Sequence, residues 1–363
     1  MPPSQVDMGI PLIQGLEKRR GEISMKFMMG LHPRAEATTI EWAKTAEQVG
    51  FDAVGIADSQ SVYQDTYICL SHAAKATSRI QLSTRVTNPV TRHPAVTAGC
   101  AATVDQISGG RMWIGIGTGQ NSTVQVGLSP ARLKDLREYV VAVRELLTKG
   151  TTIYKGATAR FHWYHKPIPI YVAAHGPRSL ELAGEIGDGV ISGLGLRPVD
   201  VEFALERIST GARRAGKRVE DLDIWFLGQM HIDNSYEEAL KPMLGSLASR
   251  AQELGRRPEG KNLPANMVQR LREYTERYDF NASAGERIHG GETSNTRLLH
   301  ELGILDLVVE HLGIMGTGEQ CLARVRQLEK LGVKGLITNT HILPDSKRTE
   351  IIRKWSESVI KRL

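Results

Sequence analysis

The sequence has only three cysteines and no long hydrophobic run. Cys69, Cys100 and Cys321 are too far apart in the chain to suggest a disulfide framework or a metal-binding spacing, so we expect reduced thiols and no metal site. No apolar run approaches the roughly 20 residues that cross a bilayer, and residues 1–20 lack the apolar stretch of a signal peptide. We therefore expect a cytoplasmic protein that does not engage a membrane.

Strongly basic segments are also absent. The formal net charge is +6, but the basic clusters at 18–20 and 213–218 are short and far apart. Such clusters are typical of solvated helix faces, so we expect no nucleic-acid partner. The modest positive field favours anionic small ligands such as phosphorylated cofactors.

The chain lacks a Pro/Ser-rich linker or a low-complexity tract, so residues 1–363 are predicted to form a single domain. From residue 23 onward, short apolar runs alternate with amphipathic stretches, which is typical of repeated βα units. The eight predicted strands are 23–30, 51–58, 79–86, 111–117, 168–176, 187–195, 223–232 and 333–340. Eight such units predict an α/β fold of the TIM-barrel type, a closed ring of eight parallel strands.

Two segments interrupt this repeat. Residues 152–163 predict a β-hairpin before the fifth strand. Residues 233–315 are too long for one crossover helix, so we expect an insertion that carries a helix and mobile loops on the substrate side.

The stretch RMWIGIGTGQNS, residues 111–122, places Gly115, Gly117 and Gly119 on alternate positions. A dinucleotide-binding fingerprint needs its third glycine one place later and a helix directly after it, whereas the next helical pattern begins only near Arg132. The glycines either admit a bound ring at the end of a barrel strand or relieve crowding inside the barrel. We expect a side chain at Gly119 to obstruct a cofactor without loss of stability, and one at Gly115 to overpack the interior.

Polar residues follow several of the predicted strands, at the end of the barrel where such folds carry their chemistry. Asp58 ends the second strand, residues 83–94 follow the third, and Gln120 follows the fourth. We expect Asp58 to contact a ring or substrate, the alternative being a helix cap for a segment near Ser61. Gln120 cannot donate a proton as an acid, but its amide can hydrogen-bond a ring carbonyl or a substrate.

The segment HGPRS, residues 175–179, follows the fifth predicted strand. Gly176 and Pro177 lead into a helix whose first free N–H groups belong to Arg178 and Ser179. This predicts a phosphate site that the Arg178 guanidinium reinforces, the alternative being an ordinary helix start with a solvated arginine.

Histidines supply the candidate proton donors. His93 precedes the third helix, His231 lies near the end of the seventh strand, and His341 follows the eighth. Each is placed where a substrate could reach, although a lone histidine is more often a packed or capping residue.

Four segments together resemble the bacterial luciferase-like superfamily of flavin- and deazaflavin-dependent oxidoreductases. They are GFDAVGIADS (50–59), TSRIQLSTRVTNPVTRHPAVTA (77–98), ISGGRMWIGIGTG (107–119) and YVAAHGPRSLELAGEIGDGVI (171–191). The form VTNPVTRHP, residues 86–94, is most similar to the methylenetetrahydromethanopterin-reductase-like branch. The sugar-phosphate dehydrogenases of this family have a histidine and a glutamate where this chain has Ser59 and Gln120, so that activity is not expected.

The resemblance implies a tricyclic ring at the barrel mouth, a cofactor phosphate near residues 175–179, and a non-prolyl cis peptide at Arg85–Val86 in a bulge of the third strand. The implied cofactor-binding residues are Asp58, Thr84, Arg85, Val86, Thr87, Gln120, Ala174, His175, Gly176, Pro177, Arg178 and Ser179.

The resemblance further implies an enzyme. With the histidines above, the candidate catalytic residues are Asp58, His93, Gln120 and His231. We expect a monooxygenase that takes reduced FMN from a separate flavin reductase, oxidises a small organic substrate and forms a homo-oligomer. The alternative is a coenzyme F420-dependent reductase or dehydrogenase that transfers hydride. An alternative of another class is a non-catalytic flavin-binding barrel.

Overall fold

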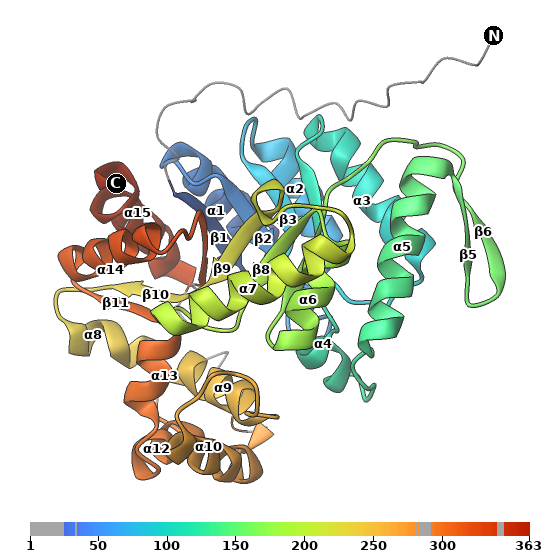
Figure 1. Cartoon of the computed structure of the whole chain (residues 1–363). Coiled ribbons are helices and arrows are strands. Elements are labelled where there is room, and N and C mark those ends of the chain that lie inside the picture. The colour runs from blue at the N-terminus through green and yellow to red at the C-terminus, as the bar shows by residue number, and fades with distance from the viewer. Residues whose placement is uncertain (1–24, 33–34, 281, 283–291, 340–344) are drawn as a thin grey trace.

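Eight parallel strands close into a barrel at the centre of the molecule (Figure 1). The computed structural model describes residues 25–32, 35–280, 282, 292–339 and 345–363. The barrel strands, in ring order, are β1 (Lys26–Leu31), β2 (Ala53–Ile56), β3 (Gln81–Thr84), β4 (Met112–Ile116), β7 (Ile170–Ala174), β8 (Gly189–Ser192), β9 (Asp223–Leu227) and β12 (Gly335–Asn339). The predicted TIM barrel is confirmed, and each predicted strand coincides with a barrel strand except that the seventh extends beyond β9.

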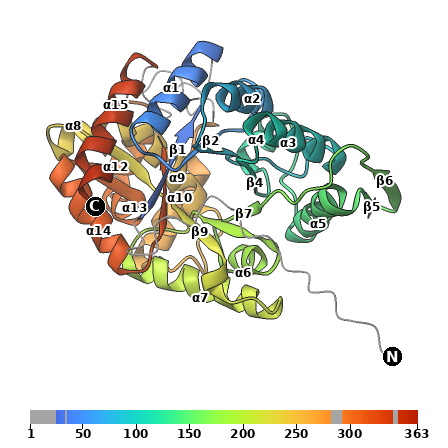
Figure 2. The same cartoon turned by 90° about the horizontal axis from the view of Figure 1, so that it is seen from above.

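Helices surround the barrel because each parallel strand must return over its outer face before the next begins (Figure 2). They are α1 (Glu36–Gln48), α2 (Thr66–Ala76), α3 (Pro94–Ser108), α5 (Leu133–Lys149), α6 (Pro177–Ile186), α7 (Pro198–Arg214), α14 (Gly318–Lys330) and α15 (Asp345–Ser358). A short helix, α4 (Gln120–Val124), lies between β4 and α5.

Side chains alternate along the strands, so each strand packs one face on the helices and the other inside the barrel. Large interior side chains gather near the amino ends of the strands, where Trp113 packs against Tyr171 and Trp225 at ring-centroid distances of 4.0 and 6.4 Å. Toward the carboxyl ends the same inward face carries Gly30 on β1 and Gly55 on β2. The interior is therefore filled at one end and left open for other groups at the other.

The amino-terminal end of the barrel is closed by a hydrogen-bonded carboxylate. Asp223 accepts from the Tyr171 hydroxyl at 2.9 Å and from Trp225 Nε1 at 3.0 Å. The Lys26 ammonium forms an ion pair with the other oxygen of Asp223. Arg111, at the start of β4, is buried and binds main-chain carbonyls of the loops around it.

The predicted seventh strand, 223–232, is two strands. After β9, Gly228 donates its N–H to the Ile337 carbonyl at 3.1 Å, and the chain then leaves the ring as β10 (Gln229–Ile232). β10 pairs in parallel with β11 (Gly313–Gly316), which returns from the insertion. The predicted single strand was wrong because its second half finds its partner outside the barrel.

Helices with their own apolar core make up the described part of the insertion. They are α8 (Tyr236–Leu240), α9 (Leu244–Gly255), α10 (Ala265–Arg277), α12 (Ser294–Glu301) and α13 (Leu305–Leu312). Leu247 and Leu271 are among the fully buried members of this core. The helices lie beyond the end of the barrel where α4 lies (Figure 1), which is the carboxyl end of the strands.

A buried ion cluster joins the insertion to the barrel. Arg197 Nε lies 2.7 Å from Asp200 Oδ2 at the start of α7, and His311 Nδ1 of α13 lies 2.9 Å from the same oxygen. Arg197 also donates to the Asn262 carbonyl of the insertion at 2.8 Å. Burial opposes ionisation of Asp200, but the hydrogen bonds from His311 and Arg197 prevail and lower its pKa. The helices of the insertion are thus fixed against the barrel by polar contacts.

Two smaller predictions are also confirmed. The hairpin consists of β5 (Thr151–Tyr154) and β6 (Ala157–Arg160), with both turn residues, Lys155 and Gly156, in the left-handed conformation. The three cysteines are unpaired.

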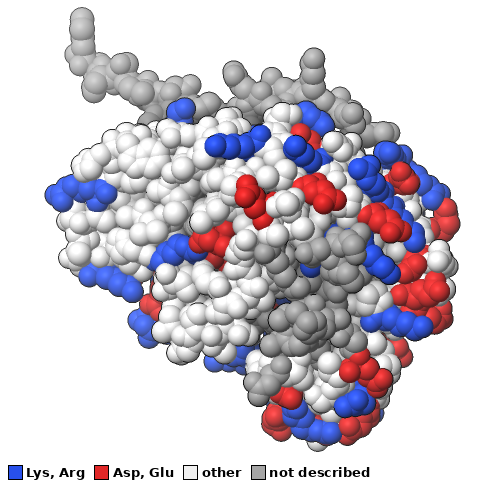
Figure 3. Space-filling model, turned by 180° about the vertical axis from the view of Figure 1, so that it is seen from behind, with Lys and Arg blue, Asp and Glu red and all other residues white. Residues whose placement is uncertain are grey.

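Basic and acidic side chains are intermixed on the face seen in Figure 3, next to a broad uncharged area. Within the described ranges, no helix is long and apolar enough to cross a membrane. The same residues include no group of three or more His, Cys, Asp or Glu side chains placed to hold a metal ion.

Candidate active site

The loop after β3 turns inward through a cis peptide. The Arg85–Val86 bond is cis, as the resemblance implies. Pairing with β4 resumes directly afterwards, because Thr87 N–H donates to the Gly115 carbonyl at 2.9 Å and Gly117 N–H donates to the Thr87 carbonyl at 3.0 Å. Thr84 secures the other side of the bulge by donating its hydroxyl to the Gly115 carbonyl at 2.7 Å.

The side chains of Arg85, Val86 and His175 form the floor of the mouth, each lying against a glycine of the barrel interior. An added Cβ would come within 3.2 Å of a Val86 methyl at Gly117 and within 2.3 Å of the His175 ring at Gly193. At Gly30 it would come within 2.8 Å of Arg85 Nε. The small interior residues near the mouth therefore make room for this floor.

The glycines of the 111–122 stretch have different roles. A Cβ at Gly115 would lie 2.2 Å from the Thr84 carbonyl oxygen, so this residue allows the β3 bulge to approach, in line with the expected overpacking. The expectation that Gly119 would accept a side chain without loss of stability was wrong. Its φ is +87°, and a Cβ there would lie 2.5 Å from Asn88 Cβ, so a side chain would strain the protein itself.

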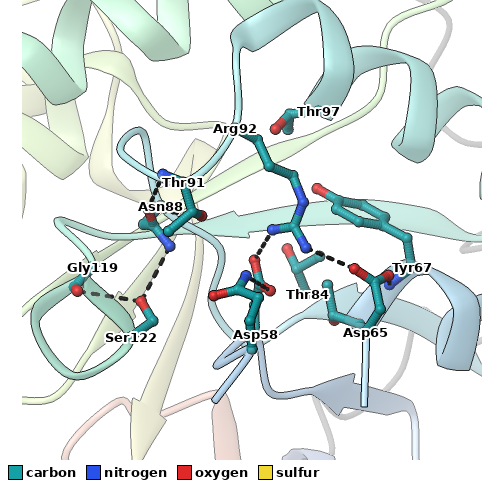
Figure 4. Close-up of polar contacts among 12 residues, drawn as sticks. Asp58, Asp65, Tyr67, Thr84, Asn88, Thr91, Arg92, Thr97, Gly119 and Ser122 are labelled. Atoms are coloured by element: carbon teal, nitrogen blue, oxygen red, sulfur yellow. Dashed lines mark hydrogen bonds and ion pairs between the residues drawn. The ribbon is translucent and has the colours of Figure 1, made fainter. Parts of the chain in front are cut away.

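Asp58 is a buried carboxylate held by an ion pair (Figure 4). Arg92 Nη1 lies 2.6 Å from one of its oxygens, and Gln60 Nε2 donates to the other at 2.7 Å. The alternative cap role is taken instead by Asp65, which accepts from the N–H of Tyr67 at the start of α2 at 2.9 Å. Asp58 thus faces the mouth region with both oxygens already engaged.

Arg92 bridges two carboxylates in this network. Its Nη2 lies 2.9 Å from Asp65 Oδ2, and its guanidinium stands over the Tyr67 ring at 5.2 Å. Burial disfavours the cation, but the charges of Asp58 and then Asp65 prevail and raise the pKa of Arg92. Sequence reasoning missed Arg92, although it lies in the 83–94 segment expected at the mouth; the acidic residues on either side of the β2–α2 loop were the available signal.

Asn88 ties the loop after β3 to α4. Its side-chain oxygen accepts from the N–H groups of Val90 and Thr91 at 2.9 and 3.0 Å, and its amide nitrogen donates to the Ser122 hydroxyl at 3.1 Å (Figure 4). Gln120, the first residue of α4, lies at the same edge. With its amide oxygen turned toward the insertion, it accepts from Arg256 Nε at 3.3 Å.

The HGPRS segment forms the predicted helix start. Ala174 ends β7, and the Ser179 hydroxyl accepts from the N–H groups of His175 and Gly176 at 3.3 and 3.1 Å. Pro177 is the first residue of α6 and lies next to Gly260 of the insertion. Arg178 is exposed and contacts no charged group among the described residues, and the space beside Gly176 is open. These features fit an anion at the start of α6.

A cleft separates this segment from the insertion. It is lined by His175 and Gly193 of the barrel and, from the insertion, by residues that include Arg250, Glu253 and Lys261. Lys261 donates to the main-chain carbonyls of Glu253 at 2.6 Å and Arg256 at 2.7 Å, and burial lowers its pKa to about 8. The end of α9 therefore covers one side of the mouth with basic residues.

Two buried donors near the carboxyl end of the barrel have no hydrogen-bond partner among the residues described. Gln229 is fully buried and accepts from Ser246 of α9, but its Nε2 has no hydrogen-bond partner within the described residues. The same is true of Arg85 Nε. Buried polar atoms are nearly always hydrogen-bonded in a complete structure, so these donors fit a polar ligand such as a cofactor ring or a substrate.

The structure does not bring the candidate histidines into this network. His93 caps α3, accepting from the Ala95 N–H at 3.2 Å, and is exposed. His231 is buried in β10, where Nε2 lies 3.8 Å from Asp233 and burial lowers its pKa. His341 lies outside the described residues.

Comparison with known proteins agrees with this geometry. Residues 25–335 match the family described as luciferase-like monooxygenase. The 5,10-methylenetetrahydromethanopterin reductase of Archaeoglobus fulgidus is 31% identical over 350 residues, which cover 93% of this chain and 100% of that protein. The structure of the coenzyme F420-dependent tetrahydromethanopterin reductase from Methanopyrus kandleri has a TM-score of 0.72 and 25% identity, covering 93% of this chain and 99% of that one. A monooxygenase from Streptomyces bottropensis, 21% identical with a TM-score of 0.65 and covering 93% of this chain and 99% of its own, shares the fold.

The protein is therefore an oxidoreductase of the luciferase-like class with a TIM-barrel fold. It belongs to the luciferase-like monooxygenase family and, within that family, to the methylenetetrahydromethanopterin-reductase-like branch.

Proposed function

We propose that this protein is a coenzyme F420-dependent oxidoreductase that transfers hydride between the deazaflavin and a small organic substrate. The carrying observation is the similarity to reductases over nearly the whole chain: 31% identity to one across 93% of this chain, and a TM-score of 0.72 to one that uses F420. These relatives favour the alternative that the sequence left open over the FMN-dependent monooxygenase expected first. When bound, the deazaflavin supplies a hydride carrier that does not react with oxygen.

The residues present fit such a group. Val86 offers an apolar surface for a flat ring, with the cis peptide behind it and Gly117 leaving the space beneath. The start of α6, together with Arg178, could bind the phosphate group on the tail of the cofactor. The Gln229 amide nitrogen remains available to a carbonyl of the ring or substrate.

Other residues would keep the site dry and ordered. The end of α9 covers the cleft above His175, which limits access of water to a bound ring. Arg92 holds Asp58 in one orientation through its bridge to Asp65. The chain would thus bind and orient the reactants rather than supply a nucleophile.

The test compares reduced F420 and reduced FMN under anaerobic conditions. We expect the deazaflavin to bind at least tenfold more tightly and its visible absorbance to change on addition of a substrate without any need for oxygen. Tighter binding of reduced FMN, together with oxygen consumption, would instead identify the monooxygenase. Binding of either cofactor without turnover of any tested substrate would favour a non-catalytic barrel. The cytoplasmic location, the homo-oligomer and, in the monooxygenase case, the flavin reductase partner stay predictions.

A further inference from the structure

The Arg85 side chain lies in a groove made by two glycines. It runs across the inner face of β2 and then β1, because a Cβ at Gly55 would lie 2.9 Å from Arg85 Cβ and one at Gly30 would lie 2.8 Å from Nε. Its Nη2 ends 2.7 Å from His32 Nε2, directly after β1. Because β1 and β2 have glycine at these two positions, the barrel has room for the long cationic side chain of Arg85 at its mouth.

This guanidinium has no counter-ion among the described residues. Its hydrogen-bond partner there is the His32 ring, and Nε has none. Burial, followed by repulsion from Arg250 of α9, lowers the pKa of Arg85 to about 10. At neutral pH the side chain still carries its charge. It is only partly exposed, and a charge largely shielded from water is normally paired because it is costly to leave alone.

Other largely buried arginines of the chain show the usual arrangement. Arg92 bridges Asp58 and Asp65, and Arg197 forms a two-point ion pair with Asp200. Arg111 has five donor contacts to oxygens of the chain. The missing partner of Arg85 is therefore a property of this position, and the position is the floor of the mouth.

We propose that Arg85 binds an anionic oxygen of a small molecule held at the mouth. The Nη1 group of Arg85, which makes no hydrogen bond among the described residues and is not one of the buried atoms, can donate to an anionic carboxylate or carbonyl oxygen. Two sources share this chemistry: an acidic group on the substrate, and the negatively charged edge of the reduced cofactor ring. The inference rests on the proposed function only in taking the mouth as the place where both bind.

The first measurement is the stability of the ligand-free protein. Arg85→Met removes an unpaired charge that is largely shielded from water while keeping much of the volume, so the melting temperature should stay the same or rise. The matched control is Arg111→Met, which breaks a satisfied network and should lower it. A loss with Arg85→Met as large as that with Arg111→Met would assign Arg85 a structural role and overturn the proposal.

The second measurement separates the two sources. If the substrate supplies the anion, wild-type protein, with and without cofactor, should bind benzoate at least tenfold more tightly than benzamide, and Arg85→Met should abolish this preference. If the cofactor ring supplies it, Arg85→Met should weaken reduced F420 at least tenfold more than oxidised F420. Arg85→Lys should restore part of either effect, because it restores the charge.

Two results keep this inference distinct from the proposed function. A preference for benzoate in cofactor-free protein that depends on Arg85 supports the anion site even if F420 fails to bind. If Arg85→Met changes neither the preference for benzoate nor the difference between reduced and oxidised F420, the proposal is wrong even for an F420 enzyme.

Discussion

The two ends of the barrel treat buried polar groups in opposite ways. At the amino end, Asp223 collects the hydroxyl of Tyr171, the indole N–H of Trp225 and an ion pair with Lys26. At the mouth, Arg85 Nε and Gln229 Nε2 lack partners within the described residues. Unpartnered donors at the mouth, beside a fully bonded carboxylate at the other end, support the proposal that a bound molecule completes the mouth.

The same difference between the two ends is seen for two arginines, Arg111 at the amino end and Arg85 at the mouth. Burial lowers the pKa of both Arg111 and Arg85. For Arg111, the free-energy cost of burial is offset by hydrogen bonds such as those to the Ala74 and Ile80 carbonyls, at 2.9 and 2.8 Å. Among the residues that the structure describes, Arg85 hydrogen-bonds only to the His32 ring. We therefore expect substitutions at the closed end to change stability and substitutions at the mouth to change ligand affinity.

The largest expected effect is at the closed end. Asp223→Ala leaves the Tyr171 hydroxyl and the Trp225 N–H without an acceptor, so the free energy of unfolding in urea should fall by about 2–4 kcal/mol. Asp221→Ala, which removes a carboxylate from an exposed pair with Arg218, is the control and should leave stability nearly unchanged. Equal effects of the two variants would contradict a stabilising role for the closed end.

At the mouth, we expect a substitution to change the affinity for the cofactor and to leave the stability of the protein nearly unchanged. Arg178→Ala should weaken binding of the phosphorylated cofactor by about 1.5–3 kcal/mol, because a charge-assisted hydrogen bond is lost, with little change in melting temperature. The dephosphorylated cofactor should bind to the wild-type protein and to Arg178→Ala with equal affinity. Arg160→Ala, on the exposed strand β6, controls for the loss of one positive charge. Equal losses for both cofactor forms would remove Arg178 from the phosphate site.

Backbone strain near the mouth gives a smaller effect. Gly119 and Gly127 both have positive φ, +87° and +74°, but only at Gly119 would a Cβ meet its neighbours. Gly119→Ala should therefore reduce the free energy of unfolding by about 1–2 kcal/mol more than Gly127→Ala does. Equal destabilisation would show that Asn88 and Thr123 move aside.

A pH-dependent effect is expected where the insertion joins the barrel. Because the native pKa of Asp200 is lowered, its stabilising contribution is present above its unfolded pKa and is lost as pH falls through the native value. Asp200→Asn should therefore flatten the acid side of the stability profile. The exposed Asp306→Asn on α13 is the control. An unchanged acid limb in Asp200→Asn would mean that the ion cluster does not contribute.

Much of the fold and part of the site were readable because they depend on local pattern. Alternating apolar and amphipathic stretches predicted the barrel strands, and Pro94 and Pro177 marked the starts of α3 and α6. The residue order around Arg85–Val86 indicated the cis peptide by resemblance. Each of these signals lies within a few residues of the feature that it predicts.

By itself, then, the sequence determined the βα order, the start of a helix at residues 175–179 and which segments meet at one end of the barrel. Tertiary structure alone decided that Arg92 holds Asp58 from 34 residues away, that β10 leaves the ring for β11, and that Arg85 meets no counter-ion in the described part of the chain. These outcomes depend on which side chains the closed barrel brings together, and on which it leaves apart, because partners far apart in the chain leave no local pattern.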